Sequence, residues 1–115
     1  MPEKKKAVLY CRTAYKYQDD SVLDAQERTI REYAKLQGYE VVSVIKESCS
    51  GINFDRPGIN AIYEIIEKEK IDAVISKDIS RYGRCLVGVL EFVKKLNEKK
   101  VSVLTTTDDD LFWFL

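Results

Sequence analysis

The 115-residue chain contains no histidine, only three cysteines and no excess of charge of either sign. Without histidine it lacks the commonest general base and metal ligand, so any catalysis depends on arginine, carboxylate, hydroxyl or thiol groups. Cys11, Cys49 and Cys85 are odd in number and form no C-x-x-C pair, which argues against a zinc site and a disulfide framework. We expect these cysteines to be small buried or half-buried thiols.

A secretory leader and a membrane span are also missing from the sequence. Residues 2–6 (PEKKK) are polar, the apolar run that follows is broken by Arg12, and no apolar stretch approaches the ~20 residues of a membrane-spanning helix. These features predict a cytoplasmic protein with no membrane partner. The length suits one small domain with a single core, and the chain has no internal repeat, linker or low-complexity segment.

The charges balance overall but are unevenly distributed. Lysine and arginine together number 19, as do aspartate and glutamate, so net charge alone indicates no nucleic-acid partner. Residues 77–100 nevertheless hold seven basic side chains against three acidic ones. Paired lysines at helix ends usually form a solvated surface that suits the helix dipole, so we give more weight to the arginines.

Strand-like and helix-like segments alternate along the chain. Nearly continuous apolar runs predict buried strands at 7–12, 39–45, 72–77 and 101–106. Three stripes at helical spacing lie between them: Leu23, Ile30, Tyr33 and Ala34; Ile59, Ile62, Tyr63 and Ile66; and Leu86, Val89, Leu90, Val93 and Leu96. Gly38 suits the end of the first helix and Pro57 the first turn of the second. This order predicts a three-layer α/β fold, with a mainly parallel four-stranded sheet between helices.

Arginines occur in the loops that follow three of the predicted strands. Such loops, at the carboxyl ends of parallel strands, commonly bind ligands. Four arginines lie in them: Arg12, Arg56, Arg81 and Arg84. A guanidinium group keeps its charge, so a cluster of four suits a phosphodiester whose negative charge grows in the transition state. The competing interpretation is that each arginine pairs with a carboxylate such as Glu47, Asp55 or Asp78.

Three motifs in these segments, "YCRTA…Q", "SGINFDRPG" and "SRYGR", together resemble the catalytic domain of the serine recombinases. This is the resolvase/invertase family, including its large transposon-type members. The similarity runs from about residue 7 to residue 107, and it implies a resolvase-like catalytic domain at 1–107. Residues 108–115 would be an apolar tail or the truncated start of a following segment.

The resemblance also implies roles for particular residues. The arginines that match those holding the scissile DNA phosphate are Arg12, Arg56, Arg81 and Arg84. Gln26 matches a glutamine near the active site, and Ser50 and Gly51 match the start of a mobile loop. Members of the family cut and rejoin DNA through phosphoserine links without a metal or other cofactor. The implied partners are DNA, further copies in a homodimer or higher homo-oligomer, and another recombinase subunit.

Ala14 departs from the family at the position of the nucleophilic serine. A methyl group cannot attack phosphorus, which predicts that the chain is inactive as written. Thr13 should face away from the arginines because adjacent strand residues point to opposite faces. Ser21, Tyr15 and Tyr17 would reach the site only if the following loop folds back.

Two hypotheses follow from this departure. The chain is either a recombinase domain whose serine has been engineered away or lost, or a degenerate resolvase-like protein that acts as an oligomerisation or regulatory module. An unrelated nucleotide-binding domain is disfavoured because the sequence has no glycine-rich phosphate loop and no acidic cluster at the strand ends.

Overall fold

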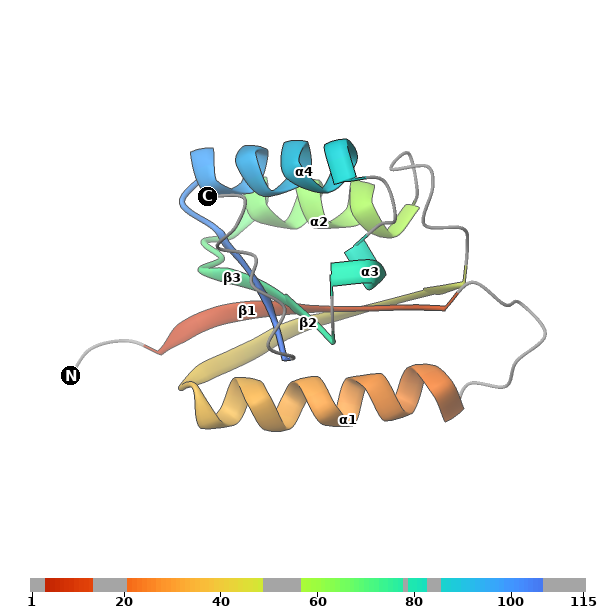
Figure 1. Cartoon of the computed structure of the whole chain (residues 1–115). Helices are drawn as coiled ribbons and strands as arrows, with labels where there is room; N and C mark the ends of the chain where they lie inside the picture. The colour runs from red at the N-terminus through yellow and green to blue at the C-terminus, as the bar shows by residue number, and fades with distance from the viewer. Residues whose placement is uncertain (1–3, 14–20, 49–56, 78, 83–85, 107–115) are drawn as a thin grey trace.

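The computed structural model describes residues 4–13, 21–48, 57–77, 79–82 and 86–106. Its sheet has four strands: β1 (Lys5–Thr13), β2 (Tyr39–Ser48), β3 (Ala73–Ser76) and β4 (Ser102–Thr105). They are all parallel and lie in the order β2-β1-β3-β4 (Figure 1). The helices are α1 (Ser21–Leu36), α2 (Pro57–Lys68), α3 (Ile79–Tyr82) and α4 (Leu86–Glu98). The predicted α/β fold with a parallel four-stranded sheet is confirmed.

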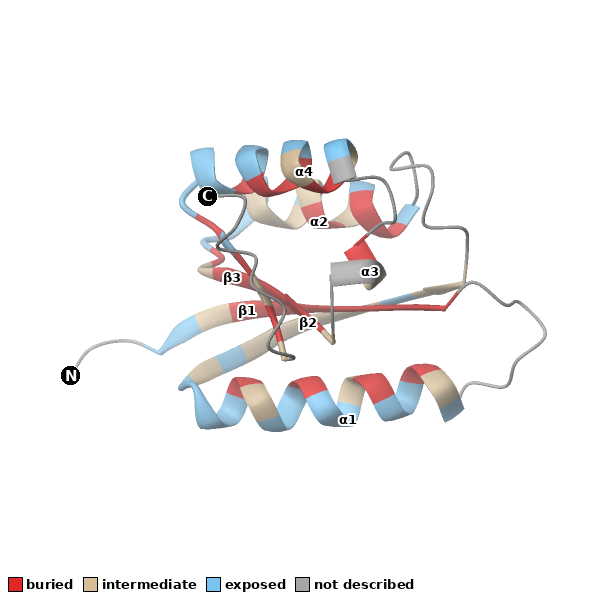
Figure 2. Ribbon diagram, viewed as in Figure 1, coloured by how far each residue is buried: buried red, intermediate tan, exposed pale blue. Residues whose placement is uncertain are grey.

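Helix α1 covers one face of the sheet, below it in Figure 1. Its buried side chains are Leu23, Gln26, Ile30 and Ala34. The apolar members of this set pack against Ala7, Leu9 and Cys11 of β1, and the buried side of the helix faces the sheet in Figure 2. An amphipathic helix of this kind is stabilised mainly by burying its apolar stripe.

Helices α2, α3 and α4 cover the opposite face. The helical side chains buried there are Ile59, Ile62, Tyr82, Val89, Phe92, Val93 and Leu96. From β1, Val8 and Tyr10 join this core, whereas their neighbours Leu9 and Cys11 belong to the core under α1. Side chains thus alternate along β1, and Arg12 continues the series that faces α2, α3 and α4.

Two predicted helix boundaries agree with the structure. Gly38 has a φ of 82° just after α1, and its N–H donates to the carbonyl of Lys35 at 3.2 Å. Glycine adopts this left-handed conformation without the steric cost of a Cβ atom. Helix α2 begins at Pro57, where the missing N–H costs no hydrogen bond.

Asp72 ties together the amino ends of three strands. Its N–H donates to the carbonyl of Lys6 at 2.8 Å, and its Oδ2 accepts the Lys6 N–H at 2.7 Å. Its carbonyl accepts the Ser102 N–H at 2.9 Å. β1, β3 and β4 therefore start from one fixed edge, and their carboxyl ends lie at the opposite edge.

None of the helices in the described ranges is both long and apolar enough to cross a membrane.

Candidate functional site

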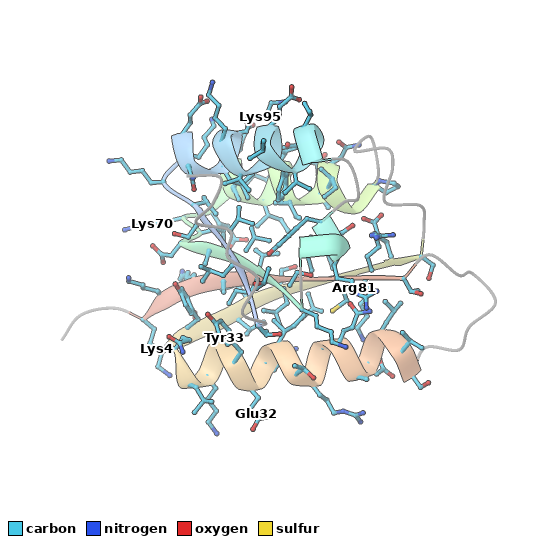
Figure 3. The ribbon with its side chains drawn as sticks, in the orientation of Figure 1. Lys4, Glu32, Tyr33, Lys70, Arg81 and Lys95 are labelled. Atoms are coloured by element: carbon cyan, nitrogen blue, oxygen red, sulfur yellow. The ribbon has the colours of Figure 1, made fainter. Side chains whose placement is uncertain are left out.

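Arg12 and Arg81 meet at the carboxyl edge of the sheet. The Nε of Arg12 donates to the carbonyl of Arg81 at 2.8 Å, and Nη1 of Arg81 donates to the carbonyl of Arg12 at 3.2 Å. Arg12 is 2% exposed and Arg81 is half-buried. Figure 3 shows Arg81 at the end of the sheet where β1 finishes. Arg12 from strand β1 and Arg81 from helix α3, 69 residues apart in the chain, are thus held together, each side chain on the other's backbone carbonyl.

Gln26 holds the backbone of Arg12. Its Oε1 accepts the Arg12 N–H at 3.1 Å, and its Nε2 donates to the Arg12 carbonyl at 3.0 Å. The β1–β3 ladder ends at the pair Leu9 and Ile75, so Arg12 lies beyond the reach of β3. The buried amide of Gln26 supplies the donor and the acceptor that a neighbouring strand would otherwise provide. This contact fixes the direction in which the Arg12 side chain leaves the strand.

Glu47 is a site residue that the sequence suggested only as a possible ion-pair partner. It lies opposite Arg12 in the β1–β2 register. Its carboxylate accepts the hydroxyl of Tyr10 through Oε2 and the N–H of Gly58 through Oε1, the latter at 3.0 Å. The first turn of a helix has unsatisfied N–H groups and a partial positive charge, which a carboxylate stabilises. Glu47 therefore fixes the start of α2 against the end of β1.

Gly58 is required by this contact. A Cβ atom at position 58 would lie 2.9 Å from Oε1 of Glu47 and closer still to its Oε2. We expect Gly58→Ala to lower the free energy of unfolding by about 1–3 kcal/mol, because the carboxylate would have to leave its position. In a Glu47→Ala background the same change should be neutral or stabilising, since alanine favours a helix more than glycine. Urea unfolding of the four proteins measures the coupling, and an equal loss in both backgrounds would contradict it.

Tyr82 anchors the short helix α3 that carries Arg81. Its hydroxyl is hydrogen-bonded to the carbonyls of Val74 (3.0 Å) and Leu104 (2.6 Å), which lie on β3 and β4. Its ring stacks on that of Tyr10 with centroids 6.0 Å apart and an angle of 9° between the planes. Burial raises the pKa of Tyr82 well above its usual value, so the hydroxyl stays protonated at neutral pH. A four-residue helix has little stability of its own, and this side chain holds it on the sheet.

The thiol and hydroxyl groups of Cys11, Thr13 and Ser21 differ in their burial. Cys11 is buried on the α1 face, and this burial raises the pKa of its thiol to about 11. Thr13 is buried as the last residue of β1, where the alternation of the strand gives it the same face as Cys11. Ser21 is exposed at the start of α1.

The other predicted site residues lie outside the described residues: Ala14, Ser50, Gly51, Arg56 and Arg84, together with Tyr15 and Tyr17. Of the predicted set, Arg12, Gln26 and Arg81 are therefore the ones whose positions are known, and Arg12 is in contact with both of the others at the end of β1. Within the described ranges, no three cysteine, aspartate or glutamate side chains gather as they would to bind a metal ion.

Comparisons with known proteins agree with this architecture. Residues 7–112 match the family described as Resolvase, N terminal domain. The C-terminal catalytic domain of ISC1926 TnpA, an IS607-like serine recombinase, superposes with a TM-score of 0.80 at 27% identity, over 90% of this chain and 70% of that one.

Two further structures share the fold at 23% identity. A resolvase family site-specific recombinase from Streptococcus pneumoniae has a TM-score of 0.80, over 96% of this chain and 81% of that one. The N-terminal catalytic domain of TP901-1 integrase has a TM-score of 0.79, over 89% and 77%. With its parallel sheet and the arginine pair at the carboxyl edge, the chain therefore belongs to the resolvase N-terminal domain family and is a serine recombinase catalytic domain.

Proposed function

We propose that this domain binds the phosphodiester backbone of DNA at the carboxyl edge of its sheet, as part of a site-specific recombinase. The mutual contacts of Arg12 and Arg81 are the observation that carries the proposal. Arg56 and Arg84 follow the ends of β2 and β3 in sequence and would add two further charges. The protein would act in the cytoplasm, on DNA and as a homodimer or higher homo-oligomer.

The chemistry that such a pocket supports is transfer of a phosphoryl group. The oxygen of a hydroxyl group gives up its proton and forms a bond to phosphorus, the bond to a deoxyribose oxygen breaks, and that oxygen leaves as a hydroxyl group with one proton gained. Guanidinium groups stabilise the additional negative charge that develops on the phosphoryl oxygens, and a buried arginine such as Arg12 does so in a low dielectric. In this proposal the transfer uses no metal or other cofactor.

Ala14 supplies no attacking oxygen, so we propose that the chain binds the phosphate without cleaving it. The carbon atom of a methyl group has no lone pair with which to attack phosphorus. Gln26 and the arginines would still hold the DNA backbone in place. This retained pocket with a missing nucleophile is the state that we assign to the sequence as it stands.

The second candidate function is a non-catalytic module that forms mixed oligomers with an active recombinase. It is favoured by the same hydrogen bonds, because Arg12 and Arg81 each bind the other's backbone carbonyl and so stabilise the fold as well. In that case the pocket would keep its arginines for structural reasons and would not bind phosphate.

Arg81→Gln separates the two functions. For a phosphate-binding pocket we expect about 5–10-fold weaker binding of a 20-base-pair duplex at low salt. The slope of log affinity against log salt should become less negative by about one. Fluorescence anisotropy of the labelled duplex measures both quantities. Arg28→Gln removes the same charge from an exposed position on α1 and should change affinity less than twofold. Equal losses for the two variants would leave the non-catalytic module as the better description.

A further inference from the structure

The amino edge of the sheet, opposite the arginines, carries a second cluster of positive charge. We define the amino-edge cluster as Lys4, Lys5, Lys6 and Lys70, which together with Asp72 line a cleft of about 270 Å³. Lys70 reaches the cleft from the segment before β3, whereas Lys5 and Lys6 begin β1 and Lys4 directly precedes it. Figure 3 shows Lys4 and Lys70 at one end of the sheet and Arg81 at the other.

The lysines of the amino-edge cluster are not neutralised by neighbouring acids. Among the described residues, none of the four ammonium groups lies within ion-pair distance of a carboxylate. Asp72, the acid that lines the cleft, directs its Oδ2 to the backbone N–H of Lys6 at 2.7 Å. Glu40, opposite Lys6 in the register, and Glu69, before Lys70, border the cluster without pairing with it. The four lysines thus lie beside three carboxylates, those of Asp72, Glu40 and Glu69, which leaves an excess of one positive charge among these described residues.

The backbone beneath the cluster is held in place. Lys6 and Asp72 form two hydrogen bonds with each other, and the Ser102 N–H donates a third to the Asp72 carbonyl. The lysine stems are flexible, but their starting points on β1 and before β3 are fixed relative to one another. Binding an anion here would therefore cost the protein less conformational entropy than binding it with four lysines of a mobile tail.

The chemistry of the cleft favours phosphate groups over a protein partner. Among the described residues, its lining consists of four lysines and one aspartate, with none of the aromatic or aliphatic side chains that anchor protein interfaces. Lysine binds phosphate as a point charge, and several lysines together bind a polyanion by releasing its counterions. β1 has nine residues, which at ~3.3 Å each separates the two edges by roughly 25 Å. One phosphate cannot touch both edges.

We propose that the amino-edge cluster is a second phosphate-binding site, which contacts the backbone of a DNA segment other than the one held at the arginines. The choice of DNA rests on the function proposed above, whereas the phosphate chemistry rests on the cleft itself. Such a site would hold two DNA segments on one domain, about 25 Å apart across the sheet. It would read no sequence, because lysine–phosphate contacts carry none.

Backbone amide NMR of the intact chain tests this proposal, because the two edges report separately. A 20-base-pair duplex should shift the amides of residues 4–6 and 70–72 at low salt, independently of those of residues 12–13 and 81–82. Pyrophosphate should shift the first group as well, since it presents the same chemistry. Shifts confined to residues 12–13 and 81–82 would overturn the second site and leave the proposed function intact. Shifts confined to residues 4–6 and 70–72 would support the second site and contradict the proposed function.

A matched pair of charge variants supplies the second measurement. The double variant Lys4→Gln/Lys70→Gln should bind the duplex at least fivefold more weakly. The slope of log affinity against log salt should also become less negative by about two. The control is the double variant Lys35→Gln/Lys94→Gln, which removes the same charge from exposed positions on α1 and α4. It should bind the duplex less than twofold more weakly than the unchanged protein. Equal effects of the two pairs would overturn the proposal. The proposal would also be overturned if this edge bound pyrophosphate but not the duplex, because the site would then be one for small anions only.

Discussion

Ala14→Ser is expected to convert a domain that forms no covalent link with DNA into one that does. The serine hydroxyl would replace a methyl group two residues after Arg12, at the position that the sequence resemblance matches to the nucleophilic serine. Attack on a phosphate held by the arginines would join the protein to DNA through a phosphoserine. The measurement is a protease-sensitive shift of labelled DNA on a denaturing gel. The variant is fused to a dimerisation helix and a sequence-specific DNA-binding domain so that it is delivered to a defined site.

Three matched proteins make this result decisive. The unchanged fusion with Ala14 should give no adduct, and Ala14→Val should give none either. Ala14→Ser combined with Arg81→Gln should form the adduct about 10²–10³-fold more slowly, the usual effect of losing one charge-stabilising donor. An adduct from the unchanged fusion would mean that another hydroxyl, such as that of Ser21 or Tyr17, already serves as nucleophile. Complete absence of the adduct from Ala14→Ser bound to its site would contradict an intact phosphate pocket.

Tyr82→Ala is expected to lower the free energy of unfolding by about 3–5 kcal/mol, the largest stability effect that we expect from a single substitution. The ring is fully buried between Tyr10, at 6.0 Å, and Phe92, at 5.5 Å. Truncation would leave a cavity at the centre of the core formed by α2, α3 and α4. It would also release α3, and with it Arg81, from the sheet. Urea unfolding measured at pH 7 gives the stability loss.

Tyr82→Phe isolates the contribution of the hydroxyl. It keeps the ring but removes the hydrogen bonds to the carbonyls of Val74 and Leu104, so we expect a loss of about 1–2 kcal/mol. Tyr33→Ala removes a half-buried tyrosine from the opposite face and should cost less than Tyr82→Ala. A loss below 1 kcal/mol for Tyr82→Ala would contradict its role as the anchor of α3.

The fold was predictable because its signals are strong and local. Strands buried on both faces need nearly continuous apolar sequence, as the run at 7–12 has. The run at 39–45 also forms a strand, but the prediction that it is buried was wrong, because β2 lies at the edge of the sheet and its residues are half-buried or exposed. Helix α3 was predicted as part of a loop, since four residues cannot show helical periodicity. Phe92 was absent from the predicted stripe of α4, although it is buried. Its burial depends on the rings of Tyr82 and Tyr63, contacts across elements that no sequence window contains.

The candidate site was predictable only in part. The meeting of Arg12 and Arg81 follows from a general rule, since Arg12 lies at the carboxyl end of β1 and Arg81 follows the neighbouring parallel strand β3. The two hydrogen bonds from Gln26 to the Arg12 backbone do not follow from it, because they depend on the β1–β3 ladder ending at Leu9. The contact of Glu47 with Gly58 is equally invisible, because it depends on where a side chain points and not on where it lies in the sequence.

The position of a bound phosphate analogue is the most direct test of the arginine pocket. Crystals of the protein grown with selenate allow the anion to be located by the anomalous scattering of selenium. The account predicts selenate within hydrogen-bond distance of the guanidinium groups of both Arg12 and Arg81, at the carboxyl edge of the sheet. Selenate found only elsewhere, with both guanidinium groups hydrogen-bonded to protein carboxylates, would contradict it.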